Sequence, residues 1–197
     1  AKNATFLFNR DFMEYHSDRF EDYSLLIFDE SEKLVAVLPA NRVVDIVYSH
    51  QGLSYGDLLL LESIRIKDYV IIFSTLLNFL SLNNVRFLEI KSVPKIYHNT
   101  LSDEIDYVTF LAEAINFRTD VYLAIDMGKE YLPNRNRKRA LNIANKLNIE
   151  VVEDTDYESF WNTILTPNLN NRFNVKPVHS VEEIKKLAIL FPEKIKL

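Results

Sequence analysis

Residues 24–61, SLLIFDESEKLVAVLPANRVVDIVYSHQGLSYGDLLLL, decide the fold. Two apolar runs with high strand propensity, 24–29 and 34–38, flank the polar residues 30–33. That arrangement predicts an antiparallel hairpin with a short polar loop. We expect the first part of the chain to fold around this hairpin.

The octet that follows the next strand is the main candidate for a functional site. Pro39 ends the second apolar run, and residues 43–48 predict a third strand. Residues 49–56, SHQGLSYG, then place two of the chain's three glycines among polar and aromatic side chains. Connections of this kind, held by a rigid sheet, often carry functional residues.

Helices and strands alternate along the rest of the first part. Apolar residues three and four apart after Asp68 predict a helix, and residues 85–91 predict a central strand. Either Thr100 with Asp103 or Ser102 can cap a second helix, and residues 121–126 predict a further strand before Gly128. The predicted fold class is α/β (α+β), with a mixed, largely antiparallel sheet flanked by helices.

The pattern changes after Gly128, so we predict two domains, 1–128 and 129–197, of which the second is a helical extension. Its predicted elements are a basic helix over 134–147, a strand over 149–152, and two helices with capping boxes that begin at Thr155 and Ser180. The chain starts without Met, and its last five residues resemble the opening of a strand. We therefore expect a fragment of a longer protein.

Composition indicates an ordinary globular protein. Hydrophobic residues make up 48% and charged residues 26% of the 197 residues, and the net charge of −5 argues against a generally nucleic-acid-binding surface. The absence of cysteine excludes disulfides and thiolate chemistry and favours a cytoplasmic location. No apolar run approaches the ~18 residues of a membrane span.

Two side chains of the octet have the chemistry of a catalytic pair. An imidazole with a pKa near ~6.5 accepts a proton at neutral pH, so His50 is a candidate general base and Tyr55 a candidate hydroxyl donor. A histidine that merely satisfies its hydrogen bonds at a strand end is the alternative. Gln51, Gly52 and Gly56 could cradle a phosphate, although a turn or bulge explains the same glycines.

A second candidate group follows the predicted central strand. Tyr97 and His98 come after a strand and a proline, and Asp106 and Tyr107 lie one turn into the next helix. We treat His98 as a candidate catalytic residue and the other three as candidate substrate contacts. Ordinary helix capping and packing explain the same residues.

The second domain contributes further candidates. Trp161, Arg172 and His179 could line a substrate groove, although a lone Trp is more often part of a core. The basic helix could hold a phosphate-bearing ligand or RNA, or it could be a solvated face. Its candidate phosphate-binding residues are Arg137, Lys138 and Arg139. The histidines are isolated and form no metal-site spacing, so we predict no metal.

Five segments also carry a family likeness: FMEYHSDRF (12–20), HQGLSYG (50–56), KSVPKIYH (91–98), NRKR (136–139) and KPVHS (176–180). With them the chain resembles the GNAT acyltransferase superfamily, and within it bacterial tandem-domain proteins similar to the FemABX peptidyltransferases. The resemblance implies a GNAT-like sheet and transfer of an acyl or aminoacyl group to an amine. It also implies a second GNAT-like domain in the same protein.

The resemblance says less about the donor. GNAT enzymes hold coenzyme A on a turn with the sequence Gln/Arg-x-x-Gly-x-Gly/Ala. When Gln51 is aligned with the first position of this motif, Gly56 matches the last position, but Ser54 replaces the first glycine. We expect this chain to be the acceptor-recognising half of an N-acyltransferase or aminoacyltransferase without a tightly bound cofactor. Acyl-CoA or aminoacyl-tRNA would be the donor, and a small molecule or cell-envelope precursor the acceptor. The alternative is a non-catalytic binding or dimerisation module.

Overall fold

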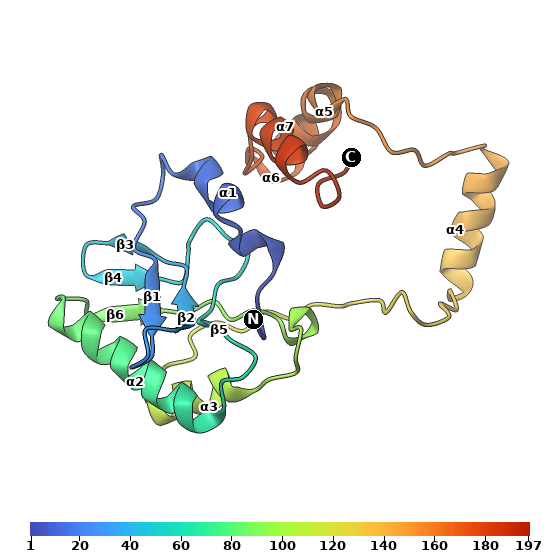
Figure 1. The fold of residues 1–197 in the computed structure, drawn as a ribbon. Coiled ribbons are helices and arrows are strands. Elements are labelled where there is room, and N and C mark those ends of the chain that lie inside the picture. The colour runs from blue at the N-terminus through green and yellow to red at the C-terminus, as the bar shows by residue number, and fades with distance from the viewer. The chain divides into compact units, whose positions relative to one another are not determined.

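The computed structural model describes all 197 residues, which form two compact units, Ala1–Ala114 and Ile115–Leu197 (Figure 1). The predicted mixed α/β class is confirmed: the first unit contains two small sheets with helices beside them, and the second contains helices only. None of these helices is both long and apolar enough to cross a bilayer.

The predicted hairpin is confirmed. Strand β1 (Leu25–Phe28) pairs antiparallel with β2 (Leu34–Leu38), and β5 (Leu59–Leu60) pairs antiparallel with the other side of β2. The carboxylate of Asp29 fixes the loop because it accepts hydrogen bonds from the backbone N–H groups of Ser31 and Lys33, at 2.9 and 3.0 Å. Asp in a tight connection commonly makes this kind of local bond.

A second sheet has the order β3-β4-β6. Strands β3 (Asn41–Val43) and β4 (Ile46–Tyr48) are antiparallel, whereas β6 (Phe87–Glu89) runs parallel to β4. The prediction of one continuous strand over 43–48 is wrong, because Val44 adopts a left-handed φ of 56° and folds the run into a tight hairpin. That turn sends β4 back toward the start of the octet.

The core of the first unit lies between these sheets and helix α2 (Ile66–Leu82). The three- and four-residue spacing predicted this helix, and its buried face consists of Tyr69, Ile72, Phe73, Leu76 and Leu80. Burial of one such side chain contributes about 1.5–3 kcal/mol. The shorter helical elements are η1 (Phe6–Phe8), α1 (Arg10–Met13), η2 (Glu14–His16), η3 (Lys95–Tyr97) and α3 (Glu104–Leu111).

The second unit contains the predicted basic helix and a set of C-terminal helices. Its elements are α4 (Arg135–Lys146), α5 (Tyr157–Ser159), the π-helical segment η4 (Phe160–Leu165), α6 (Thr166–Phe173) and α7 (Val181–Leu190). Asn134 caps α4, and the capping box at Ser180 is confirmed. The box predicted at Thr155 is wrong, because Asp156 is the residue whose side chain caps α5. The π segment precedes Pro167, whose missing N–H disturbs the regular helical bonding.

Two predicted strands do not form. Residues 121–126 and 149–152 have no strand structure, and Leu123 and Val151 are 99% and 98% exposed. A strand needs a neighbour to satisfy its backbone groups, and neither segment pairs with one in this structure. The predicted domain boundary at Gly128 depended on the first of these strands. In the structure, the chain divides into its two compact units after Ala114.

Candidate functional site

His50 stands at the end of β4 in a backbone conformation that non-glycine residues rarely adopt. Its φ is 71°, and its side chain is only 5% exposed. The imidazole stacks on that of His16, with ring centroids 5.1 Å apart and planes 28° apart, and Phe20 packs against it at 5.9 Å. A left-handed non-glycine residue costs about 1 kcal/mol or more, and such strain is concentrated at functional sites.

A small cavity of ≈ 20 Å³ opens beside these two imidazoles. That volume suits one water molecule or one ammonium group. The lining comes from the segment that precedes β1 and from the end of β4. Its residues are Arg10, Met13, Glu14, His16, Ser17, Phe20, Asp22 and His50.

The charged groups of the cavity carry an excess of negative charge. The guanidinium of Arg10 lies 3.0 Å from the carboxylate of Asp22 and also pairs with Glu14. Burial acts to raise the pKa of Asp22, but hydrogen bonds from Arg10 and from the hydroxyl and N–H of Ser24 outweigh it and lower the pKa below its usual value. One cation beside two carboxylates favours a positively charged guest.

His50 is neutral at physiological pH. Burial, followed by the proximity of His16, lowers the pKa of His50 to about 4. Its Nδ1 is buried and has no hydrogen-bond partner. In the tautomer protonated at Nε2, Nδ1 is a hydrogen-bond acceptor. Because the pKa lies well below the reference value used in the sequence prediction, His50 is suited to accept a hydrogen bond rather than to act as a strong base.

Packing and internal hydrogen bonds fix the turn after His50. Gln51 exchanges two hydrogen bonds with Asn41: the side-chain amide of Asn41 donates to Gln51 Oε1 at 2.9 Å, and the Gln51 N–H donates to Asn41 Oδ1 at 2.8 Å. The N–H of Gly56 donates to the carbonyl of Lys91 at 2.7 Å. A strand, β5, follows the turn, so no helix N-terminus is available for a phosphate. This geometry favours the turn interpretation of the glycines over the phosphate cradle.

Gly52 explains how His16 reaches this position. A Cβ atom at Gly52 would lie 2.2 Å from Nε2 of His16, which is far inside van der Waals contact. The glycine therefore leaves the space that the His16 ring occupies between the turn and η2.

Tyr55 belongs to a second cluster, with Tyr97. Their ring centroids are 5.6 Å apart, and the Tyr55 hydroxyl donates to Oγ1 of Thr5 at 3.1 Å. Lys95, two residues before Tyr97, pairs with Asp106 at 2.7 Å and ties η3 to the start of α3. The structure thus brings Tyr55 together with Tyr97, which the sequence assigned to separate groups, and links them to Asp106. The predicted partner of Tyr55, His50, is grouped with His16 instead.

The remaining predicted residues of the first unit lie on or near α3 and η3. Nε2 of His98 is 3.2 Å from the carbonyl oxygen of Val93, so this ring holds its own loop. Tyr107 is a half-exposed residue of α3. Neither lines the cavity beside His50.

In the second unit, Trp161 and His179 are in contact, because the indole N–H donates to the His179 carbonyl at 2.9 Å. This bond joins the π segment to the residue before the Ser180 cap and is structural. Arg172 is exposed at the end of α6. Arg137, Lys138 and Arg139 are exposed on α4.

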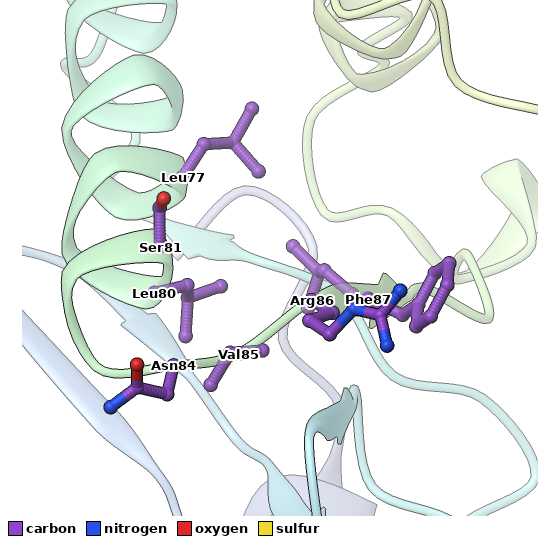
Figure 2. A pocket seen from close by; sticks show the side chains of 8 residues that line it. Leu77, Leu80, Ser81, Asn84, Val85, Arg86 and Phe87 are labelled. Carbon is purple, nitrogen blue, oxygen red and sulfur yellow. The ribbon is translucent and has the colours of Figure 1, made fainter.

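A wider hollow of ≈ 550 Å³ lies elsewhere, at the C-terminal end of α2 beside β6. Figure 2 shows Leu77, Leu80 and Ser81 projecting from the helix, with Arg86 and Phe87 on the neighbouring segment. Arg86 is its sole charged residue and lies over the ring of Phe87, 5.6 Å from the centroid. The lining contains no His, Asp, Glu, Lys or Tyr side chain that could transfer a proton, so this hollow is a poor candidate for catalysis.

Sequence reasoning missed the residues that surround His50. Arg10 and Glu14 are spaced i,i+4, the spacing of a helical ion pair, and this pattern was available in the sequence. His16 and Phe20 lie in the first segment that carries the family resemblance. No local pattern joins these residues to His50, because the contact spans more than 30 residues of chain.

No protein-family model matches the chain, and neither a curated protein nor a solved structure is significantly similar to it. No group of three or more His, Cys, Asp or Glu side chains is close enough to hold a metal ion.

Proposed function

We propose that the chain is the N-terminal, acceptor-recognising half of an N-acyltransferase or aminoacyltransferase of the GNAT and FemABX type. The cavity beside His50 would bind the amine of the acceptor. The observation that supports this is a strained, buried, neutral imidazole with a free ring nitrogen at the wall of a cavity with excess negative charge.

An amine arrives at neutral pH mainly as its ammonium form, with a pKa near ~10.4 for an alkyl amine. Asp22 and Glu14 attract that charge, and Nδ1 of His50 accepts one of its hydrogen bonds. The cavity has room for the ammonium group alone, so the rest of the acceptor lies outside it. These residues bind and orient the nitrogen.

The donor, an acyl-CoA or aminoacyl-tRNA, would be held by a second GNAT-like domain of the same protein. The internal bonding of the Gln51–Gly56 turn supports this division, because the N–H groups of Gln51, Leu53 and Gly56 are already used within the chain. We propose a small molecule or cell-envelope precursor as the acceptor and the cytoplasm as the site of reaction.

Replacement of His50 by Asn is expected to raise the KM for the amine at least about 10-fold, because a neutral hydrogen bond to a charged group is worth about 1.5–3 kcal/mol. Asn tolerates the left-handed backbone and lacks the imidazole. The measurement is amine-dependent release of coenzyme A thiol by the full-length protein, screened over primary amines such as glucosamine, lysine and ethanolamine. Asp22→Asn should act in the same direction.

Asp18→Asn is the matched control, since Asp18 lies in the same segment with a side chain 78% exposed. It should leave the KM unchanged. Equal KM values for wild type, His50→Asn and Asp22→Asn would remove the cavity from acceptor binding. Absence of turnover with any amine, together with no calorimetric binding of acetyl-CoA by the full-length protein, would favour aminoacyl-tRNA as donor or the non-catalytic module.

A further inference from the structure

Helix α4 is amphipathic and has no buried residue among its 12. Leu141, Ile143 and Leu147 at its C-cap are 54%, 49% and 65% exposed. An isolated helix of this length is marginally stable in water, because nucleation is costly and the apolar face gains nothing. The helix is therefore suited to a surface that covers that face.

The two faces of α4 are chemically distinct. Residues spaced three, four and seven apart form the apolar stripe Ala140, Ile143, Ala144 and Leu147. Arg135 and Lys138 lie on the opposite face, and Arg137, Arg139 and Lys146 flank the stripe on its two sides. The helix has five cations and no acidic residue, in a chain whose net charge is −5.

The charge and shape of α4 select among possible partners. A nucleic acid would neutralise the basic face but would leave the apolar stripe in water. A protein groove usually takes large side chains as anchors, and here two of the four stripe residues are alanines. An anionic lipid surface satisfies both faces, since the stripe enters the headgroup boundary while long Arg and Lys side chains reach the lipid phosphates. Tyr131 and Leu132, 54% and 75% exposed just before the helix, fit the same interface.

We propose that α4 is a docking helix for anionic lipid surfaces, which lies in the plane of the bilayer interface with its apolar stripe inserted. This docking is independent of the acceptor site and adds a membrane-surface location to the chain. No part of the helix spans the bilayer.

The test is co-sedimentation of the full chain with vesicles of phosphatidylcholine and phosphatidylglycerol, beside vesicles of phosphatidylcholine alone. We expect binding to the anionic vesicles that weakens as salt is added. The triple variant Arg135→Gln, Lys138→Gln, Arg139→Gln should lower the partition coefficient on the order of 100-fold, because each cation contributes about a factor of five. The double variant Ile143→Ser, Leu147→Ser should lower it at least about 10-fold.

The matched control is Lys33→Gln, Lys67→Gln, Lys194→Gln, which removes three exposed cations outside α4 and should retain binding. A loss in this control equal to that of the α4 triple variant would show that net charge, and not the helix, determines binding, and would overturn the proposal. So would equal binding to both kinds of vesicle. A third outcome would assign α4 to nucleic acid instead. In that outcome the chain does not bind vesicles but binds a fluorescent tRNA tightly and in a salt-sensitive way, and the Ile143→Ser, Leu147→Ser variant retains the tRNA binding.

Discussion

Gly56→Ala is expected to lower the free energy of unfolding of the first unit by about 3 kcal/mol or more. A Cβ atom at this position would lie 1.5 Å from the carbonyl oxygen of Ser49, so the backbone itself must move. The movement would break the bond from Gly56 N–H to the Lys91 carbonyl and disturb the 2.9 Å bond from Lys91 N–H to the Ser49 hydroxyl. These bonds join the octet to the end of β6.

Urea unfolding followed by far-UV circular dichroism measures this change. The single tryptophan, Trp161, belongs to the second unit, so its fluorescence is a separate readout that should not shift. Gly128→Ala is the control, because a Cβ there meets first a side-chain oxygen of Asp126, at 3.2 Å. If Gly56→Ala lowers the free energy of unfolding no more than Gly128→Ala does, the turn is loosely packed.

Asp57→Asn is expected to remove a large part of the pH dependence of stability. Asp57 is fully buried, and its Oδ1 accepts from the N–H of Leu58 at 2.7 Å while Oδ2 has no hydrogen bond of good geometry. Burial raises the pKa of Asp57 to about 7. The folded chain thus binds this proton more tightly than the unfolded chain does. The protonated Asp57 therefore contributes its full stabilisation of the fold below the ordinary aspartate pKa, and this contribution is lost as the pH rises through about 7.

The stability of Asp57→Asn relative to wild type should therefore rise by up to roughly 4 kcal/mol in unfolding free energy as the pH increases from 4 to 8. Urea titrations of both proteins at several pH values measure it. Asp18→Asn, on the surface, should change stability by less than about 0.5 kcal/mol throughout. A difference between Asp57→Asn and wild type that is the same at every pH would mean that Asp57 titrates alike in the folded and unfolded chains.

The sequence predicted the elements that local patterns specify. The β1–β2 hairpin, α2, α4 and the Ser180 cap follow from propensity, spacing and capping residues alone. Strand predictions at 121–126 and 149–152 were wrong because a strand also depends on a neighbour, which no local pattern reveals. The hairpin at Val44 was missed because valine rarely adopts a left-handed turn conformation.

The candidate site could be predicted only in part. His50 was identified from its position after a strand, but its low pKa depends on burial and on His16, which approaches from a distant segment. Tyr55 and Tyr97 were both identified, and their contact arises because the octet is bonded to the end of β6. Long-range packing of this kind decides which of the predicted residues meet.

The paired amides of Asn41 and Gln51 have a consequence for any guest of the cavity. Because Gln51 is held through its side chain and its N–H, the chain's own hydrogen bonds fix the backbone next to His50. Little conformational entropy of the protein remains to be lost on binding, so this wall of the cavity is preorganised. The selectivity of the cavity then depends on how well a guest matches the fixed positions of the side chains in this wall, because a rigid wall does not adapt to a guest that fits poorly.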